Sequence, residues 1–230
     1  MKALLFDLDD TLLDYSEGVD AHWQEAVRAH APAGADAAKL VEAVAEARRW
    51  FWDDPARHRR ERVDMLGAWQ HIVEFALARL QLEADGLAPA IARDFAARRR
   101  AAMRLFPDAL ESLERFRRRS VPLGLVTNGD AAMQRDKIER YGLAPFFGAI
   151  VIEGEFGAGK PDALVYRHAL AQLGAAPEDA WMVGDHLEFD VEAPQSLGLK
   201  GVWVDRAGRG LPAGSPVRPH RIVRSLRDLE

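Results

Sequence analysis

The sequence predicts an α/β protein: a parallel β-sheet with helices on both faces, interrupted after its first strand by an inserted helical domain. Three observations support this class. The apolar run Ala3–Phe6 is too short, and too close to the N-terminus, for a helix and indicates a buried strand. From about Ser16 to Met103 only helical patterns occur. From Pro107 onward, apolar runs alternate with helical segments, as in a parallel sheet covered on both faces.

The inserted domain is expected to be a small antiparallel helix bundle with its own core. Its helices are expected over 19–30, 37–52, 63–82 and 89–103. In the third of these, apolar residues recur at helical spacing between Met65 and Leu80 and form a wide stripe. Proline and glycine between the segments mark their ends.

The remainder of the chain supplies the other elements of the sheet domain. Strands are expected over 123–127, 149–152, 180–183, 201–204 and 221–223, and helices over 109–118, 131–141 and 163–173. Gly174 follows the last of these helices in the position typical of a helix C-terminus. The sequence therefore predicts a core domain from residues 1–15 and 104–230, with a helical domain in residues 16–103.

Composition excludes several classes of function. The 230 residues contain no cysteine, which excludes disulfides, thiol catalysis and cysteine-bound zinc and agrees with a reducing cytoplasm. The net charge of −5 argues against binding to a nucleic acid polymer. No apolar stretch is long enough to span a bilayer, so no membrane association is expected. A monomer or a homodimer is expected.

Two carboxylates, Asp7 and Asp9, stand directly after the first predicted strand. Ligands of open α/β sheets bind at the carboxyl ends of the strands. Residues two apart on an extended chain point the same way, so these side chains are expected to converge. Their mutual repulsion then requires a cation or a shared proton.

Further polar groups follow other predicted strands and are expected at the same edge of the sheet. They are Thr127-Asn128-Gly129, Lys160, and Asp185 with Asp190. The carboxylates form an oxygen site suited to Mg²⁺. Lys160 offers a positive charge for an anionic group, while the Thr127 hydroxyl and the amides of Asn128 and Gly129 form a phosphate cradle. Together these groups favour phosphoryl transfer through a carboxylate nucleophile.

These segments resemble the four motifs of the haloacid dehalogenase (HAD) superfamily of phosphohydrolases. The matching segments, in order, are Asp7-Leu8-Asp9-Asp10-Thr11, then Thr127, then Gly159-Lys160-Pro161-Asp162, then Gly184-Asp185 through Asp190. The resemblance spans essentially the whole chain. It implies a HAD-like, Rossmann-type core, and the helical insertion resembles the C1 cap domain of the phosphatase branch.

The resemblance also implies roles for the residues. Asp7 would attack phosphorus, and Asp9 would protonate the leaving oxygen and then activate water. Thr127 and Lys160 would hold the phosphoryl oxygens. Mg²⁺ would be bound by Asp7, the backbone carbonyl of Asp9, Asp185 and Asp190, the last directly or through water. Dehalogenating relatives lack a carboxylate at the position of Asp9, so its presence favours phosphate esters.

Substrate choice is expected to depend on the cap. Trp50-Phe51-Trp52 precedes an arginine-rich run that ends at Arg62. In one interpretation the aromatic rings stack on the substrate and Arg62 holds an anionic or polar group. In the other, which we favour, Trp50 and Phe51 pack in the bundle core and the arginines lie in a solvated loop. His186 is expected to be a loop residue, since Mg²⁺ prefers oxygen ligands.

The predicted function is therefore a cytoplasmic, Mg²⁺-dependent phosphatase that hydrolyses a small phosphomonoester through an aspartyl-phosphate on Asp7. The substrate class includes nucleotides, sugar phosphates and related metabolites. One alternative is a phosphomutase of the β-phosphoglucomutase type. Another is a non-catalytic binding protein on a HAD scaffold, since a fold alone does not define a function.

Overall fold

The computed structural model describes residues 2–229, and the chain divides into two compact units. Unit 1 contains residues 1–15 and 104–230, and unit 2 contains residues 16–103. Met1 and Glu230, where the predicted core domain begins and ends, lie outside the described residues. Each unit has its own buried core and is described by itself below.

Unit 1 is built on a parallel sheet, as the sequence predicted. Over residues 2–229 this sheet has six strands in the order β5-β4-β1-β6-β7-β8. Their bounds are β1 Ala3–Phe6, β4 Leu123–Thr127, β5 Ala149–Ile152, β6 Ala180–Gly184, β7 Lys200–Val204 and β8 Arg221–Val223. The first strand of the chain thus lies inside the sheet, between β4 and β6. The predicted α/β class is confirmed.

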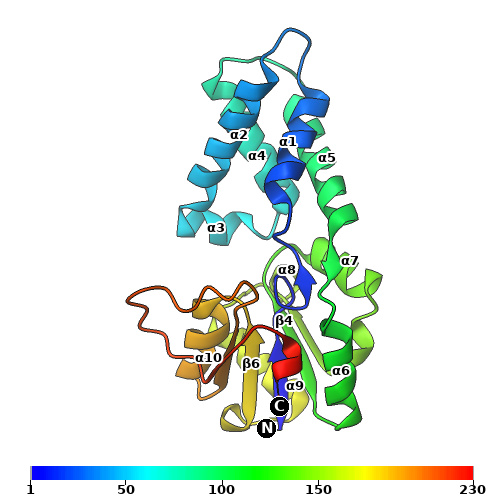
Figure 1. Ribbon diagram of the computed structural model, residues 1–230, viewed down its shortest axis with the longest axis vertical. Helices are drawn as coiled ribbons and strands as arrows, with labels where there is room; N and C mark the ends of the chain where they lie inside the picture. The colour runs from blue at the N-terminus through cyan, green and yellow to red at the C-terminus, as the bar shows by residue number, and fades with distance from the viewer. Residues whose placement is uncertain (1, 230) are drawn as a thin grey trace. The chain divides into compact units, whose positions relative to one another are not determined.

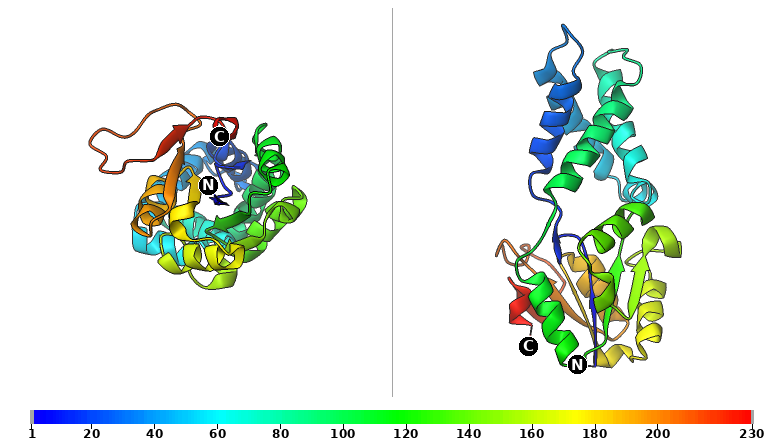
Figure 2. Two further views of the ribbon diagram at one scale, coloured as in Figure 1. Left: turned by 90° about the horizontal axis from the view of Figure 1, so that it is seen from below. Right: turned by 90° about the vertical axis from the view of Figure 1, so that its right-hand side faces the viewer.

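Side chains of β1 alternate between the two faces of the sheet. Leu4 and Phe6 pack in a cluster with helix α6 (Ala109–Arg118). Ala3 and Leu5 pack in a second cluster with helix α9 (Ala163–Leu173). Because successive side chains of a strand point to opposite faces, four apolar residues suffice to bury β1 on both sides. In the right-hand view of Figure 2 the green α6 and the yellow α9 flank the sheet.

The remaining elements of unit 1 connect these layers. They are β2 Leu13–Asp14, β3 Arg104–Leu105, α7 Ala131–Arg140, α8 Glu153–Phe156, a π-helix over Leu187–Glu192, α10 Ala193–Ser196, and short 3₁₀ turns over Ala144–Phe146, Pro177–Asp179 and Leu226–Asp228. Strands β2 and β3 pair antiparallel as a separate small sheet. This pair was not predicted from the sequence, because two-residue strands leave no periodic pattern.

Unit 2 contains only helices among its described residues. They are α1 Val19–His30, α2 Ala37–Trp52, α3 Pro55–Glu61, α4 Met65–Arg79 and α5 Leu87–Ala102. Figure 1 shows α1, α2, α4 and α5 running beside one another. Their core includes Trp23, whose ring stacks on that of Phe95 at 3.9 Å, and Trp69, which meets Phe95 edge-on at 4.9 Å.

Helix α3 lies where the sequence predicted a solvated loop for the arginine-rich run, so that prediction was wrong. The local signals for a helix were present. The side chain of Asp54 caps the helix by accepting hydrogen bonds from the amides of Ala56 and Arg57, and Pro55 occupies the first turn. The Asp-Pro pair therefore starts a helix here instead of only ending the preceding one. The helix expected over 63–82 is shorter and corresponds to α4.

No helix among residues 2–229 is both long and apolar enough to cross a membrane.

Candidate active site

Asp7 lies at the carboxyl end of β1 and is held there by the backbone. Its N–H donates to the carbonyl of Val183 in β6 at 2.9 Å, so Asp7 continues the strand pairing beyond Phe6. The chain then turns back, because the carbonyl of Leu8 accepts the N–H of Leu12 at 2.9 Å. This turn brings the Thr11 hydroxyl to 3.3 Å from Asp7 Oδ2. Asp7 is buried, at 7% exposure.

Lys160 lies between two buried carboxylates. Its Nζ is 2.6 Å from Asp7 Oδ1 and 2.6 Å from Asp190 Oδ1. The side chains of Lys160 and Asp190 are exposed by 3% and 0%. Burial by itself would lower the pKa of Lys160, but the two carboxylates outweigh it and raise that pKa above its usual range. Lys160 therefore carries its charge at every physiological pH.

Asp7 belongs to a cluster of three carboxylates. One oxygen from each of Asp7, Asp185 and Asp190 lies within 4.8 Å of the others. Lys160 contacts Asp7 and Asp190. A set of hard oxygen donors with an excess of negative charge fits Mg²⁺, which takes carboxylates together with water and phosphate oxygens. The residues present thus suit the metal that the sequence analysis predicted.

Burial and the neighbouring carboxylates raise the pKa values of Asp7 and Asp185. Burial, opposed by Lys160, raises the pKa of Asp7 to about 7, and Asp190 and Asp9 add to the increase. Burial also raises the pKa of Asp185 to about 9, with further contributions from Asp7 and Asp190. In the absence of a metal, the folded protein therefore retains protons that the unfolded chain releases.

This proton uptake predicts how stability depends on pH without divalent metal. The folded-state pKa values of Asp7 and Asp185 lie above the usual carboxyl range, so the folded state binds more protons than the unfolded state above about pH 4. The free energy of unfolding in EDTA is expected to fall as the pH rises from 6 to 9, by about 1.4 kcal/mol per pH unit for each extra proton that the folded state still holds. Urea unfolding across this range measures it. Asp185→Asn should flatten the dependence, and an unchanged slope in that variant would exclude Asp185 as its source.

Asp9 lies near Asp7 but has different partners. Its Oδ1 and Oδ2 are 2.8 Å and 2.7 Å from Lys137 Nζ, and Oδ2 is 3.1 Å from Gln134 Nε2. Lys137 and Gln134 both come from α7. No lysine partner for Asp9 was predicted from the sequence. In the structure, Asp7 contacts Lys160, which it shares with Asp190, and Asp9 contacts Lys137.

The predicted phosphate-binding groups lie beside these residues, at the end of β4. The Thr127 hydroxyl is 2.6 Å from Gln134 Nε2. The Asn128 side chain exchanges two hydrogen bonds with the backbone of Lys160, at 2.7 Å and 2.8 Å, and so fixes the Lys160 loop against β4. The Gly129 N–H donates to Glu153 Oε2 at 2.9 Å. Its predicted place in a phosphate cradle therefore already has a carboxylate partner, and binding of phosphate there would require Glu153 to move.

Two glycines permit the close packing of this site. A Cβ on Gly159 would lie 2.4 Å from the Glu153 carboxylate, and a Cβ on Gly184 would lie 2.3 Å from that of Asp190. Neither carboxylate is at the free end of an exposed chain, so any side chain at these positions would displace it. Gly159 and Gly184 are thus required because the carboxylates of Glu153 and Asp190 occupy the space that a Cβ would need.

Residues behind the site support the Asp185 loop. The Trp203 indole N–H donates to the Asp185 carbonyl at 2.7 Å, so this tryptophan does more than fill the core. The His186 N–H donates to Asp190 Oδ2 at 3.0 Å, and its ring stacks on Phe189 at 3.9 Å. His186 thus shapes the loop, as expected, and the carboxylate cluster does not include it.

In unit 2, Trp50 does not match either interpretation from the sequence. Its ring stacks on Phe75 at 4.0 Å, while the Arg57 guanidinium lies 3.8 Å from the ring centre. Both faces of the indole are therefore covered, although the side chain is 45% exposed. Phe51 is buried in the core, as expected. Arg62 is also buried, at the end of α3, so its proposed contact with a substrate stays a prediction.

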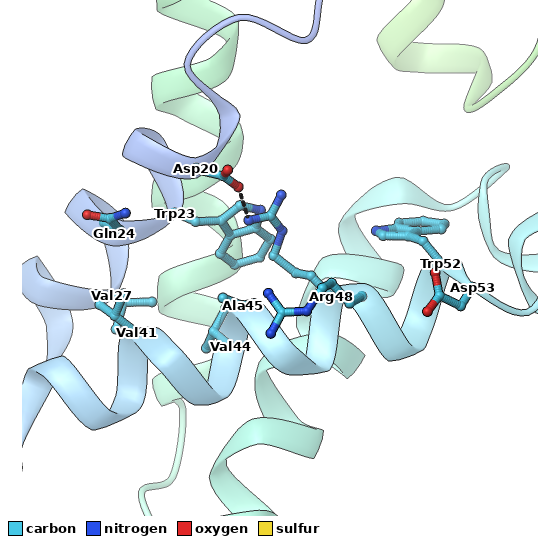
Figure 3. A pocket seen from close by; sticks show the side chains of 11 residues that line it. Asp20, Trp23, Gln24, Val27, Val41, Val44, Ala45, Arg48, Trp52 and Asp53 are labelled. Carbon is cyan, nitrogen blue, oxygen red and sulfur yellow. Dashed lines mark hydrogen bonds and ion pairs between the residues drawn. The ribbon is translucent and has the colours of Figure 1, made fainter. Parts of the chain in front are cut away.

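Unit 2 also contains a pocket of about 410 Å³. Its walls combine aliphatic residues with charged and aromatic ones: Asp20, Trp23, Gln24, Val27, Val41, Val44, Ala45, Arg48, Arg49, Trp52 and Asp53. Figure 3 shows Arg48 reaching over Trp23 to Asp20, and the ion pair measures 2.7 Å. Arg62 does not belong to this lining.

Sequence reasoning missed three polar residues of the site, which are Gln134, Lys137 and Glu153. One signal for Lys137 was available. The chain has only five lysines against many arginines, and two of the five, Lys137 and Lys160, are buried beside the aspartates of the first motif. A lysine used in place of arginine indicates a confined position for a compact charge. Glu153 gave no comparable signal.

The fold and this arrangement of aspartates and lysines agree with the comparisons. A family model described as haloacid dehalogenase-like hydrolase matches residues 1–198. The chain therefore belongs to the haloacid dehalogenase-like hydrolases, as its motifs predicted. Over its full length it is similar to the phosphoserine phosphatase of Thermus thermophilus, with 36% identity over 251 aligned positions that cover 98% of that protein.

Two further relatives agree. The glyceraldehyde 3-phosphate phosphatase of Methanopyrus kandleri is 31% identical over 90% of this chain and 84% of its own. The structure of a HAD hydrolase of Bacillus subtilis, YfnB bound to magnesium, has a TM-score of 0.73 at 22% identity, covering 99% of this chain and 96% of that one, and supports the fold alone. The chain is a phosphomonoester hydrolase that acts on small phosphorylated substrates.

Proposed function

We propose that this protein is a Mg²⁺-dependent phosphatase that hydrolyses a small primary phosphate ester through a covalent aspartyl-phosphate on Asp7. The observation that carries the proposal is the setting of Asp7, which is buried, 2.6 Å from Lys160 and within 4.8 Å of two further carboxylates. A carboxylate that only maintained the fold would not need this concentration of charge. We assign the nucleophile to Asp7 for this reason.

In the first half of the reaction, an oxygen of Asp7 attacks phosphorus and the bond from phosphorus to the leaving oxygen breaks. Asp9 gives its proton to that oxygen, so the product leaves as an alcohol. Lys160 holds Asp7 in place and reduces the repulsion between its carboxylate and the incoming phosphate. The Thr127 hydroxyl and the Asn128 amide bind the phosphoryl oxygens.

In the second half, water attacks phosphorus of the aspartyl-phosphate and the bond to Asp7 breaks. Asp9, now a carboxylate, takes the proton of that water and returns to its starting state. Inorganic phosphate is released, and the carboxylate of Asp7 is regenerated.

Asp7, Asp185, Asp190 and the backbone carbonyl of Asp9 would hold Mg²⁺. When bound, the ion supplies positive charge that offsets the three carboxylates and the phosphate dianion. Trp203 holds the backbone carbonyl of Asp185, and the His186 amide holds the carboxylate of Asp190, which would keep both residues in place for the ion.

The substrate class follows from the relatives that align over most of their length. Phosphoserine and glyceraldehyde 3-phosphate, the substrates in their names, are both three-carbon molecules phosphorylated on a primary carbon. We therefore place short primary phosphate esters first among the candidate substrates, ahead of nucleotides and sugar phosphates. Arg62 stays a proposed contact for the rest of the substrate. Cytoplasmic location and a monomeric or homodimeric state also stay predictions.

A panel of phosphate metabolites with Mg²⁺ or with EDTA tests the proposal. We expect release of inorganic phosphate from three-carbon phosphates, a loss of at least about 100-fold in EDTA, and recovery on addition of Mg²⁺. Full activity in EDTA would contradict the metal dependence. The same panel separates the alternatives. Interconversion of two sugar phosphates would indicate a mutase, and no turnover of any ester would indicate a binding protein.

A further inference from the structure

Helix α7 holds the carboxylate of Asp9 with two side chains. Lys137 Nζ lies 2.8 Å from Oδ1 and 2.7 Å from Oδ2 of Asp9, and Gln134 Nε2 lies 3.1 Å from Oδ2. Gln134 and Lys137 are three residues apart and so share one face of the helix. The contacts join positions that are 125 and 128 residues apart in the sequence.

This ion pair differs from those on the protein surface. The side chain of Lys137 is 6% exposed and that of Asp9 is 22% exposed. The ammonium also lies 4.0 Å from the centre of the Tyr15 ring, which covers it. Exposed pairs are mobile and contribute little, whereas a buried pair keeps a defined geometry. Lys137 is therefore built to hold Asp9 in one position.

Gln134 links the same carboxylate to the phosphate-binding residues. Its amide nitrogen is 2.6 Å from Thr127 Oγ1 and 2.9 Å from the Asn128 carbonyl, in addition to its contact with Asp9. An amide nitrogen has two hydrogens, so these three acceptors share them. The contact with Asp9 is the longest of the three, which leaves Lys137 as the principal partner of that side chain.

We propose that Lys137 is a positioning residue for the general acid: when Asp9 carries its proton on Oδ1, Lys137 holds Oδ2, and Oδ1 delivers that proton to the leaving oxygen. Oδ2 has two partners, Lys137 and Gln134, and stays held when Oδ1 turns to the substrate. Without Lys137, Asp9 would keep only the longer contact with Gln134 and would spend less time within the 2.6–3.2 Å reach that proton transfer requires. The role rests on the proposed function, in which Asp9 is the general acid, and Lys137 itself touches no reacting atom.

A pair of substrates of matched shape tests this role. Phenyl phosphate releases a basic phenolate that needs a proton, whereas p-nitrophenyl phosphate releases a stable anion that does not. In Lys137→Met, kcat/KM is expected to fall about 100-fold for phenyl phosphate and less than about 3-fold for p-nitrophenyl phosphate. Since kcat/KM covers only the steps up to release of the alcohol, the later hydrolysis of the aspartyl-phosphate does not affect it.

Four further variants complete the experiment. Lys137→Arg keeps the cation and should restore most of the phenyl phosphate activity. Lys39→Met, at an exposed position in unit 2, should leave both substrates unchanged. Asp9→Asn should show the selective loss by itself, and adding Lys137→Met to it should cause no further selective loss.

The ratio of the two kcat/KM values decides the result, because the fraction of folded enzyme cancels in it. Equal losses for both substrates, or no loss, in Lys137→Met would overturn the positioning role. So would an additive effect in the double variant. By contrast, a wild-type protein that cleaved neither ester nor any member of the metabolite panel would refute the proposed function itself.

Discussion

Asp7→Asn is expected to lower kcat by about 10⁴-fold or more, which corresponds to about 5.5 kcal/mol of transition-state stabilisation. The amide keeps the size and burial of the side chain but has no anionic oxygen to attack phosphorus. Initial rates of phosphate release from the best ester of the panel, measured with saturating Mg²⁺, provide the test. Asp85→Asn, which changes an exposed carboxylate in unit 2, is the matched control and should retain full activity.

The same variant should separate catalysis from stability. Because burial raises the pKa of Asp7 to about 7, its negative charge is a cost to the metal-free fold above that pH. Asp7→Asn is therefore expected to be at least as stable as the wild type in EDTA at pH 8, while being inactive. Mass spectrometry of acid-quenched wild type should also find a phosphoryl group on the peptide that contains Asp7. Turnover near the wild-type rate in Asp7→Asn would rule out the covalent mechanism.

Lys160→Met is expected to lower kcat by about 10³-fold and also to destabilise the fold. Its ammonium is 2.6 Å from both Asp7 and Asp190, and removal of one partner of a buried ion pair typically costs about 3–5 kcal/mol. Protonation of the carboxylates relieves part of this cost at low pH. In EDTA, the loss of unfolding free energy should therefore be larger at pH 9 than at pH 6. Activity assays and urea unfolding at both pH values measure the two effects.

Two comparisons sharpen this result. Lys160→Arg should not restore activity, because a planar guanidinium does not fit a buried position shaped for a compact ammonium between two carboxylates. Lys200→Met changes an exposed lysine of the same unit and should have little effect. Mg²⁺ should recover part of the lost stability in Lys160→Met, since it binds the folded state. A variant as active and as stable as the wild type would show that Lys160 does not have the role assigned to it.

Much of the fold was predictable because it depends on local pattern. Runs such as Ala3–Phe6 and Leu123–Thr127 are continuously apolar, which is what burial on both faces of a parallel sheet requires. Helix α3 was missed although its signal was local, since Asp54 and Pro55 were taken only as the end of α2. Strands β2 and β3 left no signal, because each has two residues and their pairing joins Leu13 to Leu105.

For the candidate site, too, some residues were predictable from local pattern and others were not. Asp7, Thr127, Lys160 and Asp185 were predicted from the sequence as candidate site residues, because each follows a strand or lies in a loop of the same sheet edge, and the edge of a parallel sheet collects such residues. The partners of these residues were not found. Glu153 at the Gly129 amide and Trp203 at the Asp185 carbonyl depend on which elements lie side by side in space.

By itself, the sequence determined the class of fold, and it predicted the sheet edge of the candidate site and the aspartate that we propose attacks phosphorus. Backbone geometry sets the period of strands and helices, so these features are recorded in neighbouring residues. Only the tertiary structure decided that Asp9 is held by Lys137 and Gln134 and that Asp7 shares Lys160 with Asp190. Such pairings form between side chains that are far apart in the sequence, so no local sequence pattern can predict them.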